Sequence, residues 1–207
     1  AQSAGLAAAR LFRRLRGAGD STGVVGSMSG RAFETERLII RRLAKGDLAD
    51  LTALLSDPEV MRFSVRGVCD RRATRRFLDW SRDCHALRGF GPMALIDRDS
   101  GAFVGFCGLV PEEVAGVEEI GIGYRLARQF WHRGLATEAA RAVMAHAFDV
   151  QRLEEVVAAI EPAHRASIRV AEKIGFQAFV TCHFHGRDVR VYRLSRAQWR
   201  EMASSVG

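Results

Sequence analysis

The sequence predicts a mixed α/β (α+β) domain, in which one central sheet of about six to seven strands carries helices on both faces. Two observations predict this class. The 207 residues, about half of them apolar, can build one substantial core but leave little room for a second domain. From Glu34 onward, apolar patterns with the periods of strands and helices follow one another in the order βααβββαβαββ. Such a succession places the strands in one sheet that the helices can cover.

Residues 1–30 differ from the rest, and we expect them to form a flexible, arginine-rich extension ahead of a single domain at residues 31–207. The run LAAARLFRRLRG favours a short basic amphipathic helix, and GAGDSTGVVGSMSG has the composition of a flexible linker. The arginine-rich, acid-poor start resembles a transit peptide. The simpler interpretation is an extension that takes no part in the fold, with Met28 as a natural start.

The charge and the apolar runs argue against two classes of partner. Of the formal charge of +7, residues 1–31 contribute +4, because they hold five arginines and one aspartate. The domain itself therefore carries no excess that favours nucleic-acid binding. No apolar run approaches the roughly 20 residues that a membrane span requires. We expect neither a nucleic acid nor a membrane as partner; a nucleic-acid-binding protein led by the basic N-terminal arm is the third alternative for the function.

The cysteines and histidines show no spacing typical of metal ligands. The four cysteines are scattered without a CxxC pair, and the six histidines lack any HExxH-like pattern. We expect reduced thiols in a cytoplasmic protein and no metal site. The cysteines are Cys69, Cys84, Cys107 and Cys182.

The N-terminal part of the domain predicts a strand and two helices. RLIIRRL, residues 37–43, alternates like a strand. Asp47 is then expected to cap a helix that runs to Leu55 and ends at DPEV. A second helix is expected at about 70–87, with an apolar stripe formed by Phe77, Trp80, Cys84 and Leu87.

The middle of the domain predicts strands on either side of a helix. The stretch GPMALIDRDSGAFVGFCGL predicts two strands around a turn at 97–101, which is a hairpin signal. EEIGIGYRL, residues 118–126, predicts a further strand. After a helix that opens at Gly134, EEVVAAI, residues 154–160, predicts a buried strand.

The C-terminal part predicts a helix, two strands and a short final helix. AHRASIRVAEKIGF favours a helix that ends at Gly175, because glycine adopts the left-handed conformation common after a helix. Strands are expected at about 177–182 and 188–195, joined by a turn at Gly186, and a helix at 196–202 follows.

The stretch FWHRGLATEAARAVMAHAF, residues 130–148, begins a helix without a Ser or Asp cap. An open helix N-terminus offers free backbone N–H groups and about half a positive charge, which suits a phosphate. Gly134 would let such a group approach, and Arg128 and Arg133 would add charge at a pyrophosphate; an ordinary helix start is the alternative. The stretch is neither a Walker loop nor a GxGxxG turn. The helical spacing is carried by Leu135, Ala139, Ala142, Val143, Ala147 and Phe148.

WHRGLATEA, residues 131–139, resembles the acyl-CoA pyrophosphate loop of the GCN5-related N-acetyltransferase (GNAT) superfamily. More narrowly, it resembles the branch that acetylates the N-terminal alanine or serine of ribosomal proteins, in which W-G-x-G-x-A-T-E-A is typical. Further stretches resemble that branch in the same order: ETERLIIRRL, DPEVMRF, SGAFVGFCGL, IGYRL, ASIRVAEKIGF and VYRLSRAQW. The resemblance covers about residues 34–199, nearly the whole domain, and it implies the GNAT fold.

The resemblance implies acetyl-CoA as cosubstrate and places it residue by residue. The strand that ends at Leu126 would separate from the next strand of the sheet, and the pantetheine arm would enter between them. Backbone groups of Tyr124, Arg125 and Leu126 would bind the arm. Loop amides would hold the pyrophosphate, with Arg128 nearby; the loop residues are His132, Arg133, Gly134, Leu135, Ala136 and Thr137.

Two residues depart from the pattern of the family. His132 stands where glycine is common, which implies either a tighter loop or an imidazole donor to the pyrophosphate. His164, a further implied cofactor contact, stands where the family usually has asparagine in the pattern N-x-x-S. Ser167 matches the serine of that pattern.

Acetyl transfer to an amine requires a group that accepts the amine's proton and a proton for the leaving thiolate. Many relatives carry a glutamate where Gly121 stands. Glu119 lies two residues earlier on the same face of the strand, about 7 Å away by strand rise, and is the candidate base; a solvated charge at a strand end is the alternative. Ser167 is the candidate donor to the sulfur, and hydrogen bonding at the helix N-terminus is its alternative.

We therefore expect an acetyl-CoA-dependent N-acetyltransferase in which a primary amine attacks directly in a ternary complex, without a metal or a covalent enzyme intermediate. The acceptor is a protein N-terminus or a small amine, since the branch has diversified. The alternative is a CoA-binding regulatory or interaction module of the same fold, which Gly121 and His164 motivate. Dimers are common in the branch, so a homodimer remains open.

Overall fold

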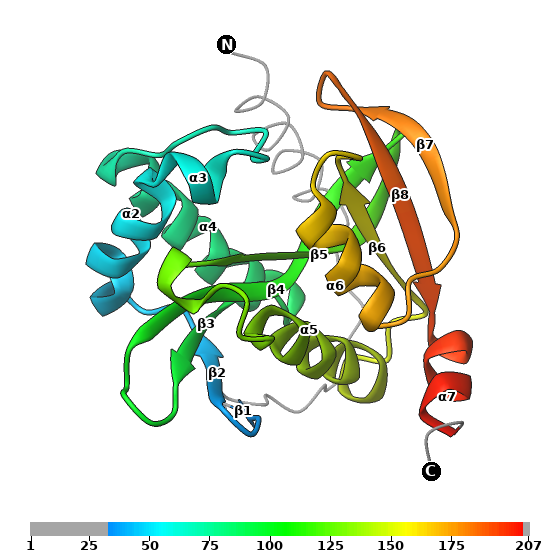
Figure 1. The fold of residues 1–207 in the computed structure, drawn as a ribbon, viewed down its shortest axis with the longest axis horizontal. Helices are drawn as coiled ribbons and strands as arrows, with labels where there is room; N and C mark the ends of the chain where they lie inside the picture. Colours follow the sequence, from blue (N-terminus) through cyan, green and yellow to red (C-terminus); the bar gives the residue numbers. More distant parts are fainter. Residues whose placement is uncertain (1–32, 205–207) are drawn as a thin grey trace.

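The computed structural model describes residues 33–204, so the expectations for residues 1–30 lie outside the described part of the chain. Eight strands form one sheet within it (Figure 1). The strands are β1 (Phe33–Glu34), β2 (Leu38–Arg42), β3 (Pro92–Asp97), β4 (Phe103–Val114), β5 (Val117–Leu126), β6 (Glu155–Ile160), β7 (Phe179–Phe184) and β8 (Arg187–Ser195). The α-helices are α2 (Leu48–Ser56), α3 (Pro58–Met61), α4 (Arg71–Arg88), α5 (Leu135–Ala145), α6 (Arg165–Lys173) and α7 (Arg196–Ser204).

The strands lie in the order β1-β2-β3-β4-β5-β6-β8-β7. Neighbours pair antiparallel except β5 and β6, which are parallel. A parallel step needs a crossover, and α5 supplies it between the end of β5 and the start of β6. The N-terminus of α5 therefore lies beyond the carboxyl end of β5, where ligand crevices form in parallel sheets.

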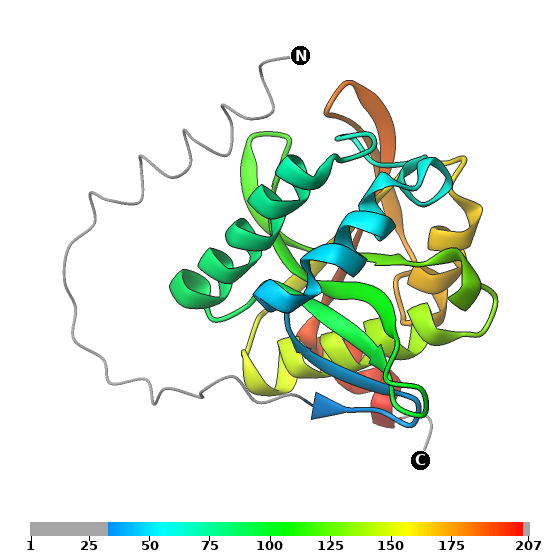
Figure 2. The ribbon, with the colours of Figure 1, turned by 90° about the vertical axis from the view of Figure 1, so that its left-hand side faces the viewer.

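Two apolar clusters lie on opposite faces of the sheet. Ala94 and Leu95, neighbours in β3, belong to different clusters, as alternate side chains of a strand must. The larger cluster packs α5 and α6 through residues such as Met144, and the smaller packs α2 and α4 through Leu51 and Leu78. Figure 2 shows α2 and α4 on the near side of the strands. The predicted class, one mixed sheet with helices on both faces, is confirmed.

β4 and β5 form a long hairpin around Ala115 and Gly116, whose φ angles of 51° and 83° fit a type I′ turn. Its register places Glu112 opposite Glu119. The sequence predicted β5 but ended the preceding strand with FVGFCGL. That boundary is wrong, since β4 extends to Val114, whose side chain is buried.

Two details of the helices also differ from the prediction. DPEV does not simply end α2: Asp57 accepts a hydrogen bond from the Glu59 N–H at 2.8 Å and so caps the separate helix α3. In α4, Leu87 is 72% exposed, because the helix buries Ser81 and His85 instead. Both polar side chains lie within hydrogen-bond distance of the same β3 carbonyl, which a search for apolar periodicity cannot detect. The other predicted elements begin and end within about two residues of the observed ones, although α5 ends in a π-turn at His146–Val150.

Candidate active site

β5 and β6 separate at the centre of the sheet. Their ladder holds a single pair, Gly121 with Val157, whereas every residue of β5 pairs with β4 on the other side. Beyond Gly121, β5 has no strand neighbour on this side in the described part of the chain. Backbone N–H and C=O groups inside a protein normally find partners. β5 therefore presents a free edge in the middle of the sheet, as the family resemblance implied.

Two side chains of the same segment bond to this free edge. The N–H of Ala127 donates to β4, so the trans peptide turns the carbonyl of Leu126 to the open side. Trp131 Nε1 donates to that carbonyl at 2.7 Å. Two residues earlier, Arg125 Nη1 donates to the carbonyl of Tyr124 at 2.8 Å. The carbonyls of Tyr124 and Leu126 thus accept hydrogen bonds from side chains, in the place where the N–H groups of a neighbouring strand would otherwise donate.

The side chain of Arg125 adds a charge that the sequence did not lead us to expect at this edge. Solvent reaches part of the residue, but protein surrounds the guanidinium on most sides, and this burial lowers its pKa. Arg125 forms no ion pair with any residue between 33 and 204. Its charge contributes to the lowered pKa of His164, so the two groups lie near each other.

α5 begins at Leu135 behind Gly134, whose φ of 79° is in the left-handed region that favours glycine. Among the described residues, no side chain caps the first turn. The first N–H groups of a helix have no intrahelical partner and carry its positive dipole end. Arg37 Nη1 donates to the carbonyl of Arg133 at 2.8 Å and fixes the approach to this turn. The uncapped helix start that the sequence predicted is therefore present, and its role as an anion site stays a prediction.

Glu138 holds the start of α5 against the segment that leads into β2. Its carboxylate accepts hydrogen bonds from Thr35 Oγ1 at 2.6 Å, from the Arg37 N–H at 2.9 Å and from Arg37 Nε at 2.7 Å. Burial alone would raise the pKa of Glu138, but the hydrogen bonds from Thr35 and Arg37 outweigh it and lower the pKa. The side chain typical of the family motif therefore positions the loop.

The loop before α5 gathers the other residues predicted to bind phosphate. His132 has a φ of 58°, which explains why glycine is common there: a side chain costs about 1 kcal/mol in this conformation. Arg133 Nη2 lies 3.9 Å from Asp97 Oδ2, and its guanidinium carbon lies 5.5 Å from the centre of the Phe130 ring. His132, Arg133 and Arg128 are exposed, so their groups can reach a ligand on the surface.

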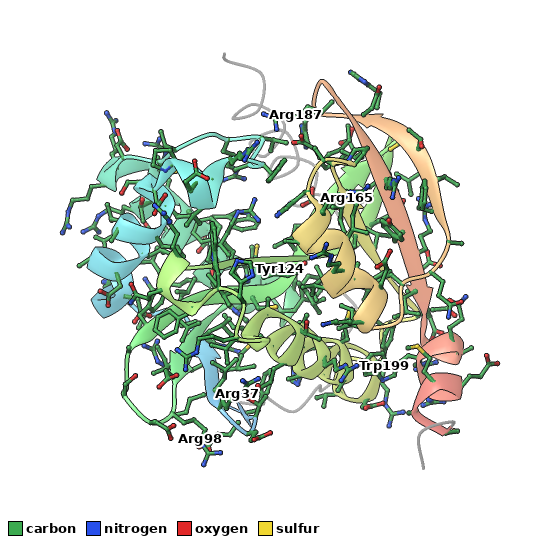
Figure 3. The ribbon with its side chains drawn as sticks, viewed as in Figure 1. Arg37, Arg98, Tyr124, Arg165, Arg187 and Trp199 are labelled. Atoms are coloured by element: carbon green, nitrogen blue, oxygen red, sulfur yellow. The ribbon has the colours of Figure 1, made fainter. Side chains whose placement is uncertain are left out.

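Tyr124 and Ser167 join β5 to α6 across the separated strands. The Tyr124 hydroxyl lies 2.7 Å from Ser167 Oγ and donates to the Ser167 carbonyl at 3.3 Å. Figure 3 shows Tyr124 beside α6. Burial raises the pKa of Tyr124 well above its ordinary value, so its phenol stays protonated at neutral pH. Tyr124, predicted as a backbone contact, thus also places a hydroxyl next to the candidate proton donor.

His164 precedes α6 but does not cap it with its side chain. Its ring stacks on that of Phe63, with 4.2 Å between the ring centres and 13° between the planes. Burial lowers the pKa of His164 to about 4, and the nearby Arg125 adds to this effect, so the imidazole is neutral at pH 7. Because Phe63 follows α3, the stack connects the two sides of the separated strands.

Glu119, the candidate base, is held by Arg193 of β8. Its Oε1 lies 2.6 Å from Nη2 and its Oε2 lies 3.0 Å from Nε, so the guanidinium engages both carboxylate oxygens. Arg193 Nε also lies 3.7 Å from Glu155 Oε1. Both oxygens of the Glu119 carboxylate are therefore already hydrogen-bonded to a side chain of another strand.

A second carboxylate, Glu112 of β4, lies on the same face and was missed from the sequence. A Cβ on Gly121 would lie 2.8 Å from Glu112 Cγ, so the side chain of Glu112 leans over Gly121. Burial raises the pKa of Glu112 to about 7, against the attraction of Arg66, which lowers it. Between residues 33 and 204 the carboxylate forms neither a hydrogen bond nor an ion pair.

The sequence contains a signal that could have found Glu112. Ala115 and Gly116 lie between Val114 and Val117, and a glycine at this place suits the second position of a two-residue hairpin turn. Counting outward from that turn pairs Glu112 with Glu119, the register that the structure has. Glu112 was missed because the predicted strand ended with FVGFCGL, three residues before it.

Within residues 33–204, the histidines near the β7–β8 turn do not form a metal site. His183 and His185 lie exposed at the β7–β8 turn, and His183 Nδ1 lies 3.1 Å from Asp188 Oδ1. Within residues 33–204, no group of three or more His, Cys, Asp or Glu side chains could hold a metal ion. No helix in the same range is both long and apolar enough to cross a bilayer.

A free strand edge beside an open helix N-terminus is the arrangement of an acetyltransferase of the GNAT class, and comparisons with known proteins agree. The family described as "Acetyltransferase (GNAT) domain" matches residues 37–177. The uncharacterized protein YkkB of Bacillus subtilis is 37% identical over 161 residues, which cover 76% of this chain and 92% of YkkB.

Two solved structures share the fold. A GNAT-family acetyltransferase from Bacillus anthracis is 25% identical, with a TM-score of 0.69, over 81% of this chain and 99% of that protein. A spermidine N-acetyltransferase from Vibrio cholerae, in complex with CoA and spermine, has a TM-score of 0.66 at 13% identity, over 80% of this chain and 99% of that protein. The chain belongs to the GNAT acetyltransferase family and is an N-acetyltransferase.

Proposed function

We propose that this N-acetyltransferase uses acetyl-CoA and that a primary amine attacks the acetyl group directly in a ternary complex. The observation that carries the proposal is the free edge of β5 beside the open N-terminus of α5. An arm that contains amide groups fits a free strand edge, and a diphosphate fits a helix N-terminus.

The residues present fit both ends of CoA. The carbonyls of Tyr124 and Leu126 each hold one side-chain donor, but a carbonyl has two lone pairs, so an amide of the pantetheine arm can bond there as well. The diphosphate would lie on the first-turn amides of α5, with Arg128 and Arg133 close by. His132 would contribute its amide and His164 the surface that it forms with Phe63. The proposed cofactor contacts are thus Tyr124, Arg125, Leu126, Arg128, His132, Arg133, Gly134, Leu135, Ala136, Thr137, His164 and Ser167.

The leaving thiolate needs a proton, and Ser167 is the proposed donor. Its hydroxyl lies 2.7 Å from that of Tyr124, so the phenol can return a proton to the serine. Because the raised pKa keeps Tyr124 protonated at neutral pH, this pair holds a proton throughout the working range. The support is geometric: both hydroxyls lie where β5 and α6 approach each other.

The attacking amine must lose a proton, and two carboxylates lie on the face of the hairpin that carries Gly121. Glu119, the candidate base from the sequence, is one proposed acceptor of this proton. Both of its carboxylate oxygens are hydrogen-bonded to Arg193. Glu112 is free of such partners among the described residues. Backbone N–H groups of β5 would hold the negative charge that develops on the thioester oxygen.

The acceptor is proposed to be a protein N-terminus or a small amine. The resemblance to enzymes that acetylate ribosomal-protein N-termini supports the first class. The second class is that of the Vibrio cholerae spermidine enzyme, with which this chain shares the fold alone. The alternative is a CoA-binding module of the same fold, which the glycine at position 121 favours.

Thiol release from acetyl-CoA tests the proposal directly. The full chain is incubated with acetyl-CoA and, separately, with peptides that begin with Ala or Ser, with spermidine and with free amino acids. We expect at least one acceptor class to release CoA well above the acceptor-free rate. Tight CoA binding by calorimetry without transfer to any amine would instead identify a binding module.

Three further expectations remain proposals. We infer a cytoplasmic site of action, which four unpaired thiols support: Cys69, Cys84 and Cys107 are buried and Cys182 is partly buried. We also propose a homodimer, because β7 is an edge strand and exposes Phe179 and Val180. Residues 1–30 are proposed to be an extension outside the domain. Sedimentation of the full chain tests the homodimer. The same measurement on residues 31–207 tests whether the domain keeps its state without residues 1–30.

A further inference from the structure

We propose that Glu112 of β4 is the carboxylate that accepts the proton of the attacking amine, a role that the sequence pattern would give to a residue of β5. The proposal rests on the proposed acetyl transfer and deepens it. Relatives commonly carry a glutamate at the position of Gly121, and here the neighbouring strand puts a carboxyl side chain into the same space.

The position of Glu112 follows from the hairpin register. Glu112 is opposite Glu119, so an upright side chain would stand two residues away from Gly121 along β5. The side chain instead leans diagonally, until its Cγ is 2.8 Å from where a Gly121 Cβ would be. No real Cβ tolerates that distance, so only glycine at position 121 leaves room for Glu112 in this conformation. The glycine that appeared to remove a catalytic carboxylate makes room for another.

The surroundings of Glu112 leave it free to take up a proton. Its carboxylate has no hydrogen-bond or ion-pair partner between residues 33 and 204. The charged groups that face it are Arg66, from the segment between α3 and α4, and the Glu119–Arg193 ion pair on the same face of the sheet. Arg66 attracts it from a distance without forming an ion pair. By contrast, both carboxylate oxygens of Glu119 accept hydrogen bonds from Arg193.

The space beside Glu112 is open to a substrate. Gly121 and Gly123 project to the same face of β5, because side-chain directions alternate along a strand. A Cβ on Gly123 would meet no atom within 4 Å. An amine therefore has room over Gly123, on the face of the hairpin that carries Glu112.

The chemistry of the step balances with these groups. The amine nitrogen forms a bond to the acetyl carbon, the carbon–sulfur bond breaks, and the thiolate takes a proton from the Ser167–Tyr124 pair. The proton lost by the amine goes to Glu112, directly or through one water. Burial disfavours the charged carboxylate and raises its pKa to about 7, which makes it a stronger base than an exposed glutamate.

The test compares Glu112→Gln with Glu119→Gln, and uses Glu113→Gln as the matched control on the exposed side of the same strand. Acetyl-CoA and the best acceptor of the panel are used, and kcat is measured from pH 5.5 to 9 beside CoA affinity by calorimetry. We expect Glu112→Gln to lower kcat roughly 100-fold or more, to bind CoA normally, and to lose the rise of kcat near pH 7. Glu119→Gln and Glu113→Gln should keep that rise.

Gly121→Ala provides a second variant that leaves the carboxylate in the chain. Its methyl group would push the Glu112 side chain away, so we expect a lower kcat. In the Glu112→Gln background, the same change should cost little more, because both changes remove one function. Fully additive losses, or a pH rise that survives in Glu112→Gln and disappears in Glu119→Gln, would overturn the assignment. If wild type binds CoA but acetylates no amine, the proposed function itself fails, and the assignment fails with it.

Discussion

Replacing Glu112 by glutamine should stabilise the protein at alkaline pH, and the effect follows from the burial of the carboxylate. The pKa of Glu112 is raised from an ordinary value of 4.5 to about 7. Between these values the folded protein binds more protons at this site than the unfolded chain, so the free energy of unfolding falls as pH rises. Each pKa unit corresponds to 1.36 kcal/mol, so a shift of about 2.5 units sets a ceiling of about 3 kcal/mol.

Urea unfolding of wild type and Glu112→Gln at pH 5 and pH 8 measures this difference. Solvent reaches part of the side chain, so we expect the advantage of the glutamine variant to grow by about 1 to 3 kcal/mol between the two pH values. Equal m-values would show that both proteins expose the same surface on unfolding. Glu113→Gln, on the exposed side of β4, is the control and should show no such growth. A difference between wild type and Glu112→Gln that does not change with pH would refute the reasoning.

Three further predictions concern β5 and the start of α5. Gly134→Ala places a side chain at a φ of 79°, so it should lower the free energy of unfolding by about 1 kcal/mol in urea and weaken CoA binding in calorimetry. Tyr124→Phe removes the hydroxyl bonded to Ser167, so kcat should fall while CoA affinity stays close to wild type; an unchanged kcat would exclude the proton relay. Glu138→Gln weakens the bonds to Thr35 and Arg37 and should cost roughly 1 to 3 kcal/mol near pH 7. Because the pKa of Glu138 is lowered, that cost should shrink as pH falls below about 4, which urea unfolding can follow.

The parts of the fold that the sequence predicted are those in which local chemistry decides the structure. Gly134 and Gly175 mark helix ends because their backbone conformations are unfavourable for other residues, and both have positive φ angles. The apolar run at 154–160 gave β6, which is buried between two strands. The residues proposed to bind phosphate could be named from the sequence because they lie in one continuous stretch, and their role stays a prediction.

What the sequence did not predict depends on contacts between distant segments. Ser81 and His85 are buried in α4 because both lie close to a single carbonyl of β3, so the helix faces a direction that its apolar residues do not indicate. Glu119 appeared free until β8 brought Arg193 to it. Glu112 was missed for a different reason: the predicted strand ended before it, so neither the local hairpin register nor the missing Cβ of Gly121 was used to place it.

A crystal structure of the protein with CoA bound tests the central claim most directly. We predict that the pantetheine arm lies along β5 at Tyr124–Leu126 and that the diphosphate accepts hydrogen bonds from the amides of residues 135–137. A diphosphate bound elsewhere, or an arm that leaves the edge of β5 unoccupied, would contradict this placement and the acetyl transfer derived from it.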